Sequence, residues 1–227
     1  MLKRAAVLFS IAALALGAAV SQDRGARPLP VLASENFESG RAEGWEPNDP
    51  ARWLVQPVGR NLVYALTSPG EPGKVRAPTS WSLWSGYEVG SFEFAGRLQC
   101  AADPAVPQRD MCVIFGFQDP THFYYVHFSA SSDDAHNVIS VVNGADRTRI
   151  SLEAPGTSVA RLTDKGWHAF KVTFDAATGE IKAYLDDMKV PILTARDRSF
   201  VQGRVGVGSF DDTGSFDDLT LRGVRIR

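Results

Sequence analysis

The sequence has little cysteine, little methionine and no excess of charge of either sign. Only two of its 227 residues are cysteine, too few to build a zinc site from thiols alone. The 24 lysines and arginines nearly balance the 26 acidic residues, the formal net charge is −2, and the two signs are interspersed. This balance gives no support for a nucleic-acid partner or for attraction to an anionic membrane surface.

Sustained helical periodicity is missing beyond the N-terminal segment, and so is any repeat of fixed period. Short runs rich in aromatic and β-branched residues alternate instead with Gly, Pro and Asp turns, which is typical of antiparallel strands. This pattern predicts an all-β antiparallel sandwich or barrel. The expected strands include 52–56, 62–66, 91–100, 112–118, 123–129, 137–143, 147–152, 167–174, 180–185, 203–210 and 216–222, with 68–80 as a loop.

The N-terminus has the features of a secretory signal peptide. Lys3 and Arg4 precede an apolar run over 5–20, and small residues before Gln22 offer a cleavage site. The run is short and rich in alanine for a membrane span, with an uncleaved anchor as the alternative. We therefore expect a secreted or periplasmic protein with no membrane insertion after cleavage, divided into a signal peptide (1–21), a leader or linker (22–33) and one domain (34–227).

The two cysteines lie at the ends of neighbouring predicted strands. Cys100 ends one strand, Cys112 opens the next, and a proline-containing loop joins them. A disulfide between them suits an oxidising compartment, provided that the two Cα atoms lie close enough. Two free thiols are the alternative.

The stretch 112–129 predicts a β-hairpin turned by Asp119-Pro120-Thr121. Strand alternation places Val113, Phe115 and Phe117 on one face with Tyr124, Val126 and Phe128, which leaves a polar and aromatic face opposite. Aromatic rings pack on the apolar faces of sugars, and amide, imidazole and hydroxyl groups bond to their hydroxyls. The alternative is a sheet covered by a loop. The predicted groove residues are Arg97, Gln99, Gln118, Tyr125, His127 and Asn143.

A series of short motifs follows in order along the C-terminal part of the chain: Gly166-Trp167-His168, Thr178-Gly179-Glu180-Ile181, Tyr184-Leu185-Asp186-Asp187, the run 203–208 (GRVGVG) and Phe216-Asp217-Asp218-Leu219. These motifs resemble those of the concanavalin A-like lectin and glucanase sandwiches, with laminin G-like modules and the 3-keto-disaccharide hydrolase family as the nearest groups. The likeness covers roughly 37–227 and implies a jelly roll of two antiparallel sheets, one of them concave and commonly used for glycans.

The resemblance also implies a structural calcium ion. In many such sandwiches the two ends of the chain meet around an ion, and the corresponding acids here are Glu38, Asp217 and Asp218. Carboxylate and carbonyl oxygens suit this hard cation. The Asp211-Asp212 turn is a second source of ligands, and all of these acids serve equally well as turn caps.

The acid pattern Glu-x-Asp-x-x-Glu of the sandwich glucanases is missing, although Glu93 and Asp119 lie near the predicted groove. The run Tyr124-Tyr125-Val126-His127 resembles a Tyr-Glu-Val-Gln pattern in the 3-keto-disaccharide hydrolase family. We therefore predict a secreted domain that binds an oligo- or polysaccharide. The alternatives are a glycoside-cleaving enzyme with His127 and Tyr125 in proton transfer, and a laminin G-like protein-interaction module.

Trp81 and Trp84 follow the breaker-rich loop 68–80. Tryptophans of a sandwich are mostly core residues, but either of these two has the position of an exposed aromatic platform. The sequence does not distinguish between them.

Overall fold

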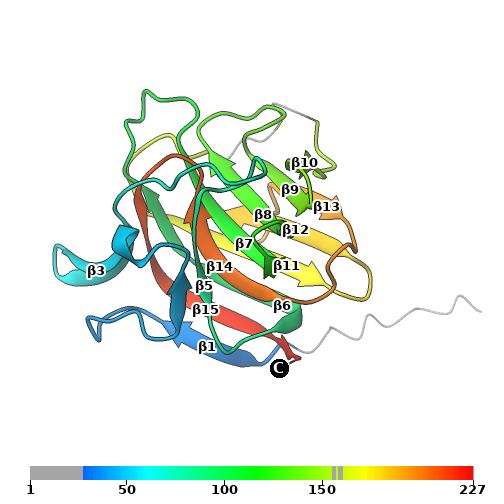
Figure 1. The fold of residues 1–227 in the computed structure, drawn as a ribbon, viewed down its shortest axis with the longest axis horizontal. Helices are drawn as coiled ribbons and strands as arrows, with labels where there is room; N and C mark the ends of the chain where they lie inside the picture. Colours follow the sequence, from blue (N-terminus) through cyan, green and yellow to red (C-terminus); the bar gives the residue numbers. More distant parts are fainter. Residues whose placement is uncertain (1–27, 155–156, 158–160, 227) are drawn as a thin grey trace, which may run out of the picture.

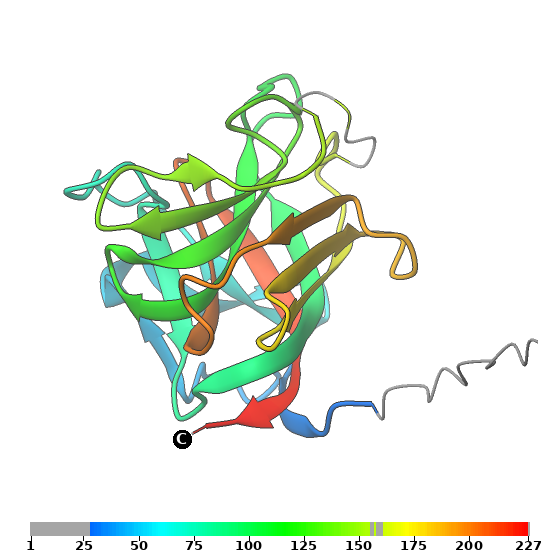
Figure 2. The same ribbon diagram turned by 90° about the vertical axis from the view of Figure 1, so that its right-hand side faces the viewer.

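The computed structural model describes residues 28–154, 157 and 161–226, and it folds these into two antiparallel sheets packed face to face (Figures 1 and 2). The larger sheet has the order β13-β12-β11-β6-β15-β4-β3, with β1 added beside β15. The other sheet has the order β10-β9-β8-β7-β14-β5-β2. The protein is therefore an all-β antiparallel sandwich with jelly-roll topology, as the sequence predicts.

The strands are β1 (Val31–Glu35), β2 (Trp45–Pro47), β3 (Trp53–Val58), β4 (Asn61–Leu66), β5 (Ser80–Trp84), β6 (Val89–Cys100), β7 (Asp110–Asp119), β8 (His122–Ser129), β9 (Val138–Asn143), β10 (Thr148–Arg149), β11 (His168–Asp175), β12 (Glu180–Leu185), β13 (Leu193–Arg196), β14 (Arg204–Ser209) and β15 (Gly214–Arg225). Among the described residues, helical structure is limited to one 3-10 turn, η1 (Pro50–Arg52).

Alternation along the strands builds the core between the two sheets. Phe94 and Leu98 of β6 point inward from the larger sheet, while Tyr124 and Val126 of β8 point inward from the seven-stranded sheet. All four side chains are buried in one continuous apolar cluster. Residues between them in sequence therefore face outward from their own sheet.

The hairpin of β7 and β8 forms as predicted, but the predicted faces hold only as far as Gly116. Val113 and Phe115 pack in the core between the sheets. Gly116 has a φ of +58°, and the pairing of β7 with β8 shifts register between Phe115 and Asp119. Phe117 therefore turns to the outer face, which corrects the expectation that it shares the face of Phe115.

The predicted signal peptide lies outside the described residues, which begin in the middle of the predicted leader. In the part of the chain that the structure describes, no helix has the length and apolar character needed to cross a membrane.

Candidate functional site

The outer face of the seven-stranded sheet is partly covered by the chain itself. A second apolar cluster lies there, formed by side chains of β5, β7, β8 and β9 together with parts of two connecting segments. The segment that joins β4 to β5 contributes Ala77 and Val75, and the turn between β14 and β15 contributes Phe210. These two segments act as a lid over one half of the face, which we call the lidded half.

Phe210 is the centre of this lid. Its ring contacts the rings of Tyr125 and His127, with centroid separations of 5.5 and 5.0 Å. The guanidinium groups of Arg76 and Arg147 lie over the Phe210 ring at 5.3 and 4.6 Å from its centroid. Cation–π contacts of this kind stabilise the closed position of Phe210.

Tyr125 and His127 do face the outer side of the sheet, as predicted, but they lie beneath the lid. Their exposed fractions are 0% and 2%, so both side chains are almost completely shielded from solvent. Burial raises the pKa of the Tyr125 hydroxyl well above its ordinary value. In this conformation no sugar can reach the two side chains. The alternative from the sequence analysis, a sheet covered by a loop, is therefore what this half of the face shows.

Arg97 and Gln99 belong to the other sheet. They alternate along β6 with the inward-facing Leu98 and Cys100, and so they point outward on the opposite side of the sandwich from Tyr125. Arg97 lies over the Trp167 ring at 5.2 Å, and Gln99 donates to the carbonyl of Lys165 at 2.6 Å. The expectation that they share one groove with Tyr125 and His127 is therefore wrong.

Asn143 and Gln118 lie at the ends of their strands. Asn143 is exposed at the end of β9, where it pairs with His122 of β8. Gln118 follows the bulge in β7 and donates to the backbone carbonyls of Gly116 and Gln202 at 3.1 and 2.5 Å. Of the six predicted groove residues, Gln118 lines an open cleft of the seven-stranded sheet.

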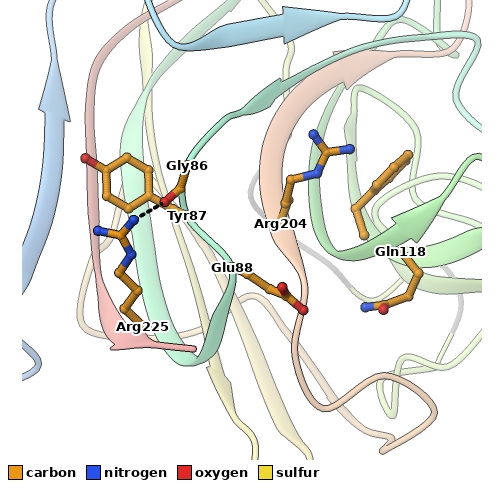
Figure 3. A pocket seen from close by; sticks show the side chains of 7 residues that line it. Gly86, Tyr87, Glu88, Gln118, Arg204 and Arg225 are labelled. Atoms are coloured by element: carbon orange, nitrogen blue, oxygen red, sulfur yellow. Dashed lines mark hydrogen bonds between the residues drawn. The ribbon is translucent and has the colours of Figure 1, made fainter. Parts of the chain in front are cut away.

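The other half of this face is open and carries two clefts. A cleft of about 380 Å³ lies between Phe117, Gln118 and Arg204 of this sheet and Arg225 of the larger sheet, with Gly86, Tyr87 and Glu88 of the β5–β6 connection completing its lining. Figure 3 shows Tyr87 and Arg225 at one side of it and Arg204 and Gln118 at the other. A second cleft, of about 370 Å³, lies between Trp81 and the lid segment that joins β4 to β5, with Val75 and Ala77 of that segment in its lining together with Asn48, Pro120 and Thr121. We call the surface around these clefts the open half.

Two aromatic side chains join the clefts. The ring of Trp81 in the second cleft lies 6.0 Å from the ring of Phe117 in the first. Trp81 is half-buried, whereas Trp84 of the same strand points into the core with an exposed fraction of 4%. The structure thus selects Trp81 as the exposed platform of the two candidates.

Charged groups frame this aromatic pair. The guanidinium of Arg204 lies over the Phe117 ring at 5.4 Å and donates to the Glu46 carboxylate at 2.6 Å. A side chain held on both sides in this way presents its remaining N–H groups in a fixed direction. Neither Arg204 nor Glu46 is predicted from the sequence to have a role in binding. The pairing of β14 with β7 places Arg204 beside Phe117, and the pairing of β2 with β5 places Glu46.

The acids expected to bind calcium are engaged in other contacts. Arg97 donates to Asp217 at 2.7 Å and pairs with Asp218 at 2.8 Å, so that a guanidinium joins the two carboxylates. Glu38 accepts instead from the amide of Leu62 at 2.9 Å. Among the described residues, these three acids do not form a single ligand set.

Cys100 and Cys112 are both free thiols, which corrects the predicted disulfide. Strand alternation is the reason. Cys100 points into the core between the sheets, whereas Cys112 points to the outer face of the seven-stranded sheet and joins the lidded half. Their side chains diverge, so a bridge would require one strand to turn over.

The comparisons with known proteins show the fold. No protein-family model and no curated protein matches the chain. Among solved structures, the carbohydrate-binding module CBM66 from Bacillus subtilis is similar, with a TM-score of 0.54, 17% identity, and coverage of 79% of this chain and 96% of that one. Domain 4 of an extracellular GH43 arabinanase from Geobacillus stearothermophilus, solved with arabinotriose, has a TM-score of 0.55 and 10% identity, with coverage of 88% of this chain and 95% of that one. Peanut lectin, solved with a 9mer peptide, has a TM-score of 0.53 and 13% identity, with coverage of 86% of this chain and 98% of that one. The chain therefore has the lectin-like sandwich fold that the sequence motifs imply.

Proposed function

We propose that the protein is a carbohydrate-binding domain that holds an oligo- or polysaccharide on the open half of the seven-stranded sheet. The observation that carries the proposal is the half-buried Trp81, set against Phe117 between two clefts that carry polar groups. An aromatic ring packs against the C–H face of a pyranose or furanose, and the polar groups beside it select hydroxyls. The likeness to a carbohydrate-binding module and to an arabinanase domain solved with a trisaccharide supports the proposal.

The polar groups of the open half suit neutral sugars. Arg204 already pairs with Glu46, so its charge is balanced inside the site. The amide oxygen of Gln118 and the carboxylate of Glu88 offer acceptors within the same cleft, and Arg204 offers donors. Hydrogen bonds from fixed side chains of both signs suit hydroxyl groups, which donate and accept at once.

Replacing Trp81 with alanine should weaken glycan binding by about 10- to 100-fold, because an aromatic anchor at the centre of a site contributes most of its affinity. Binding partners are first found on a glycan array, and dissociation constants are then measured by calorimetry. The matched control is Trp167→Ala, since Trp167 is also half-buried but stacks with Arg97 on the opposite sheet.

Two results would contradict this proposal. Failure of the folded wild-type protein to bind any glycan on the array would remove the function itself. A loss of binding in Trp167→Ala with none in Trp81→Ala would move the site to the other sheet. A protein ligand captured at Trp81 in place of a glycan would favour the interaction-module alternative.

We also propose that the domain acts outside the cytoplasm, as the basic residues and apolar run before Gln22 indicate. The expected result is a mature chain that begins near Gln22 when the full sequence is expressed with an intact secretion pathway. N-terminal sequencing of the exported protein measures this directly. A protein that keeps Met1 and stays inside the cell would refute the proposed export.

A further inference from the structure

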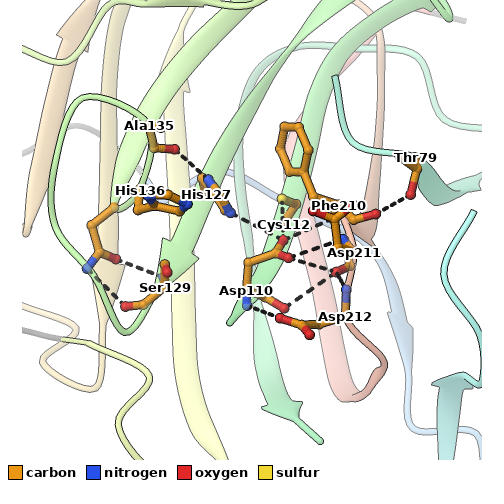
Figure 4. Close-up of polar contacts among 12 residues, drawn as sticks. Thr79, Asp110, Cys112, His127, Ser129, Ala135, His136, Phe210, Asp211 and Asp212 are labelled. Atoms are coloured by element: carbon orange, nitrogen blue, oxygen red, sulfur yellow. Dashed lines mark hydrogen bonds and ion pairs between the residues drawn. The ribbon is translucent and has the colours of Figure 1, made fainter. Parts of the chain in front are cut away.

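A cluster of three buried side chains under the lid has the composition of a metal site (Figure 4). Cys112 of β7 and His127 of β8 are direct cross-strand neighbours, and Asp110 lies two residues before Cys112 on the same face. The exposed fractions of these three residues are 0–2%. One ligand atom from each lies within 4.8 Å of the others.

The hydrogen bond at the far side of the imidazole fixes the proton of His127. Its Nδ1 lies 2.7 Å from the carbonyl oxygen of Ala135, and a carbonyl can only accept. The neutral ring therefore carries its proton on Nδ1 and turns the lone pair of Nε2 toward Asp110 and Cys112. Histidines that ligate a metal commonly hold their second nitrogen in this way.

The Nε2 atom is buried and has no hydrogen-bond partner among the residues that the structure describes, yet it lies 3.3 Å from Oδ2 of Asp110. A lone pair facing a carboxylate is repulsive. A positive charge is needed between the two atoms, either a proton or a metal ion.

Asp110 is held rigidly in position by the turn after β14. Its Oδ2 accepts from the amide of Phe210 at 3.0 Å, and its Oδ1 accepts from the hydroxyl of Ser209 at 3.1 Å. The Sγ of Cys112 lies 3.4 Å from Oδ2. Zinc bonds of about 2.0–2.3 Å place tetrahedral ligand atoms roughly 3.3–3.8 Å apart, so these separations suit one shared ion.

We propose that Asp110, Cys112 and His127 bind a divalent ion of the zinc class, with water at the fourth position. One thiolate and one carboxylate neutralise a divalent ion, so the buried site carries no net charge. Sulfur and nitrogen ligands favour zinc or cobalt over calcium and magnesium, which prefer oxygen. Binding requires Cys112 to lose its thiol proton, and the ion also displaces the proton that lies between Nε2 of His127 and Asp110 in the metal-free site, so we expect release of two protons for each ion bound.

The test uses the full chain without an affinity tag, refolded with and without zinc and then freed of loosely bound metal. We expect about one zinc ion per chain by elemental analysis and a melting temperature that rises with zinc. Cobalt in place of zinc should give the absorption band of a cobalt–thiolate bond. That band reports on Cys112 independently of stability.

Cys112→Ser should abolish the cobalt–thiolate band and weaken zinc binding by at least about 100-fold, and His127→Gln should weaken it similarly. The control is Cys100→Ser, which removes the other buried thiol and should leave both readouts unchanged. Refolded wild-type protein with native near-ultraviolet circular dichroism but no retained zinc, no change in melting temperature and no cobalt band would overturn the proposal. That result would show that a proton, and not a metal ion, supplies the positive charge between His127 and Asp110. Because glycan binding depends on the open half, Trp81→Ala should leave metal binding intact.

Discussion

Asp110→Ala should lower the free energy of unfolding by roughly 3–5 kcal/mol, because the carboxylate is a buried hub that several donors share. The substitution leaves the amide of Phe210 without its acceptor and removes the shorter of the two hydrogen bonds that the Ser209 hydroxyl donates to Asp110. It also leaves His127 beside an empty space. Since Phe210 forms the centre of the lid, we expect the lidded half to open and Tyr125 to become accessible.

Urea unfolding measures this loss, with a chelator present so that no metal contributes. Asp110→Asn keeps the shape and one acceptor, and it should cost less than the alanine variant. The matched control is Asp103→Ala, because Asp103 is an exposed carboxylate that accepts from the amide of Ala105 at 2.9 Å. Its loss should cost about 1 kcal/mol or less. Equal costs for Asp110→Ala and Asp103→Ala would show that the buried cluster does not stabilise the fold.

Most strands could be predicted because alternation and turn residues act over short distances. The pattern of 180–185 predicts β12 at its full length, and 91–100 predicts all but two residues of β6. The strand β5 carried a weaker signal. Its inner face holds the serines Ser80 and Ser82. The hydroxyl of Ser82 is hydrogen-bonded to the hydroxyl of Tyr64, 2.9 Å away inside the core. Polar residues at core positions hide the alternation that marks a strand.

The candidate site was harder to predict because it depends on contacts between distant segments. Strand alternation correctly turns Tyr125 and His127 away from the core, but Phe210 and Ala77 then cover them from two segments far along the chain. No local sequence pattern predicts such a lid. The sequence signal that was available is Gly116, since a glycine inside a strand commonly marks a bulge. Reading it as a bulge places Phe117 on the outer face beside Trp81.

Gly203→Ala should have the second large effect, since Gly203 packs directly against that bulge. A Cβ atom on Gly203 would lie 2.4 Å from the carbonyl carbon of Gly116 and 2.7 Å from the amide nitrogen of Phe117. Its φ of +154° also lies in the region that favours glycine. Gly203 exchanges two backbone hydrogen bonds with Val89, both of 3.0 Å, so it cannot move away freely. Strain and overpacking together should cost roughly 2–5 kcal/mol.

The same substitution should weaken glycan binding, because a displaced bulge moves Phe117 and Gln118 and so changes the first cleft. Urea unfolding gives the loss of stability, and calorimetry on the folded fraction gives the loss of affinity. Gly59→Ala is the matched control: Gly59 has a φ of +67°, but nothing lies within 4 Å of the position that its new methyl group would take. That variant should show only backbone strain, about 1–2 kcal/mol, with unchanged binding. If Gly203→Ala cost no more than Gly59→Ala and bound glycan as well, the bulge would not be what positions Phe117, and the open half would have to be held by other contacts.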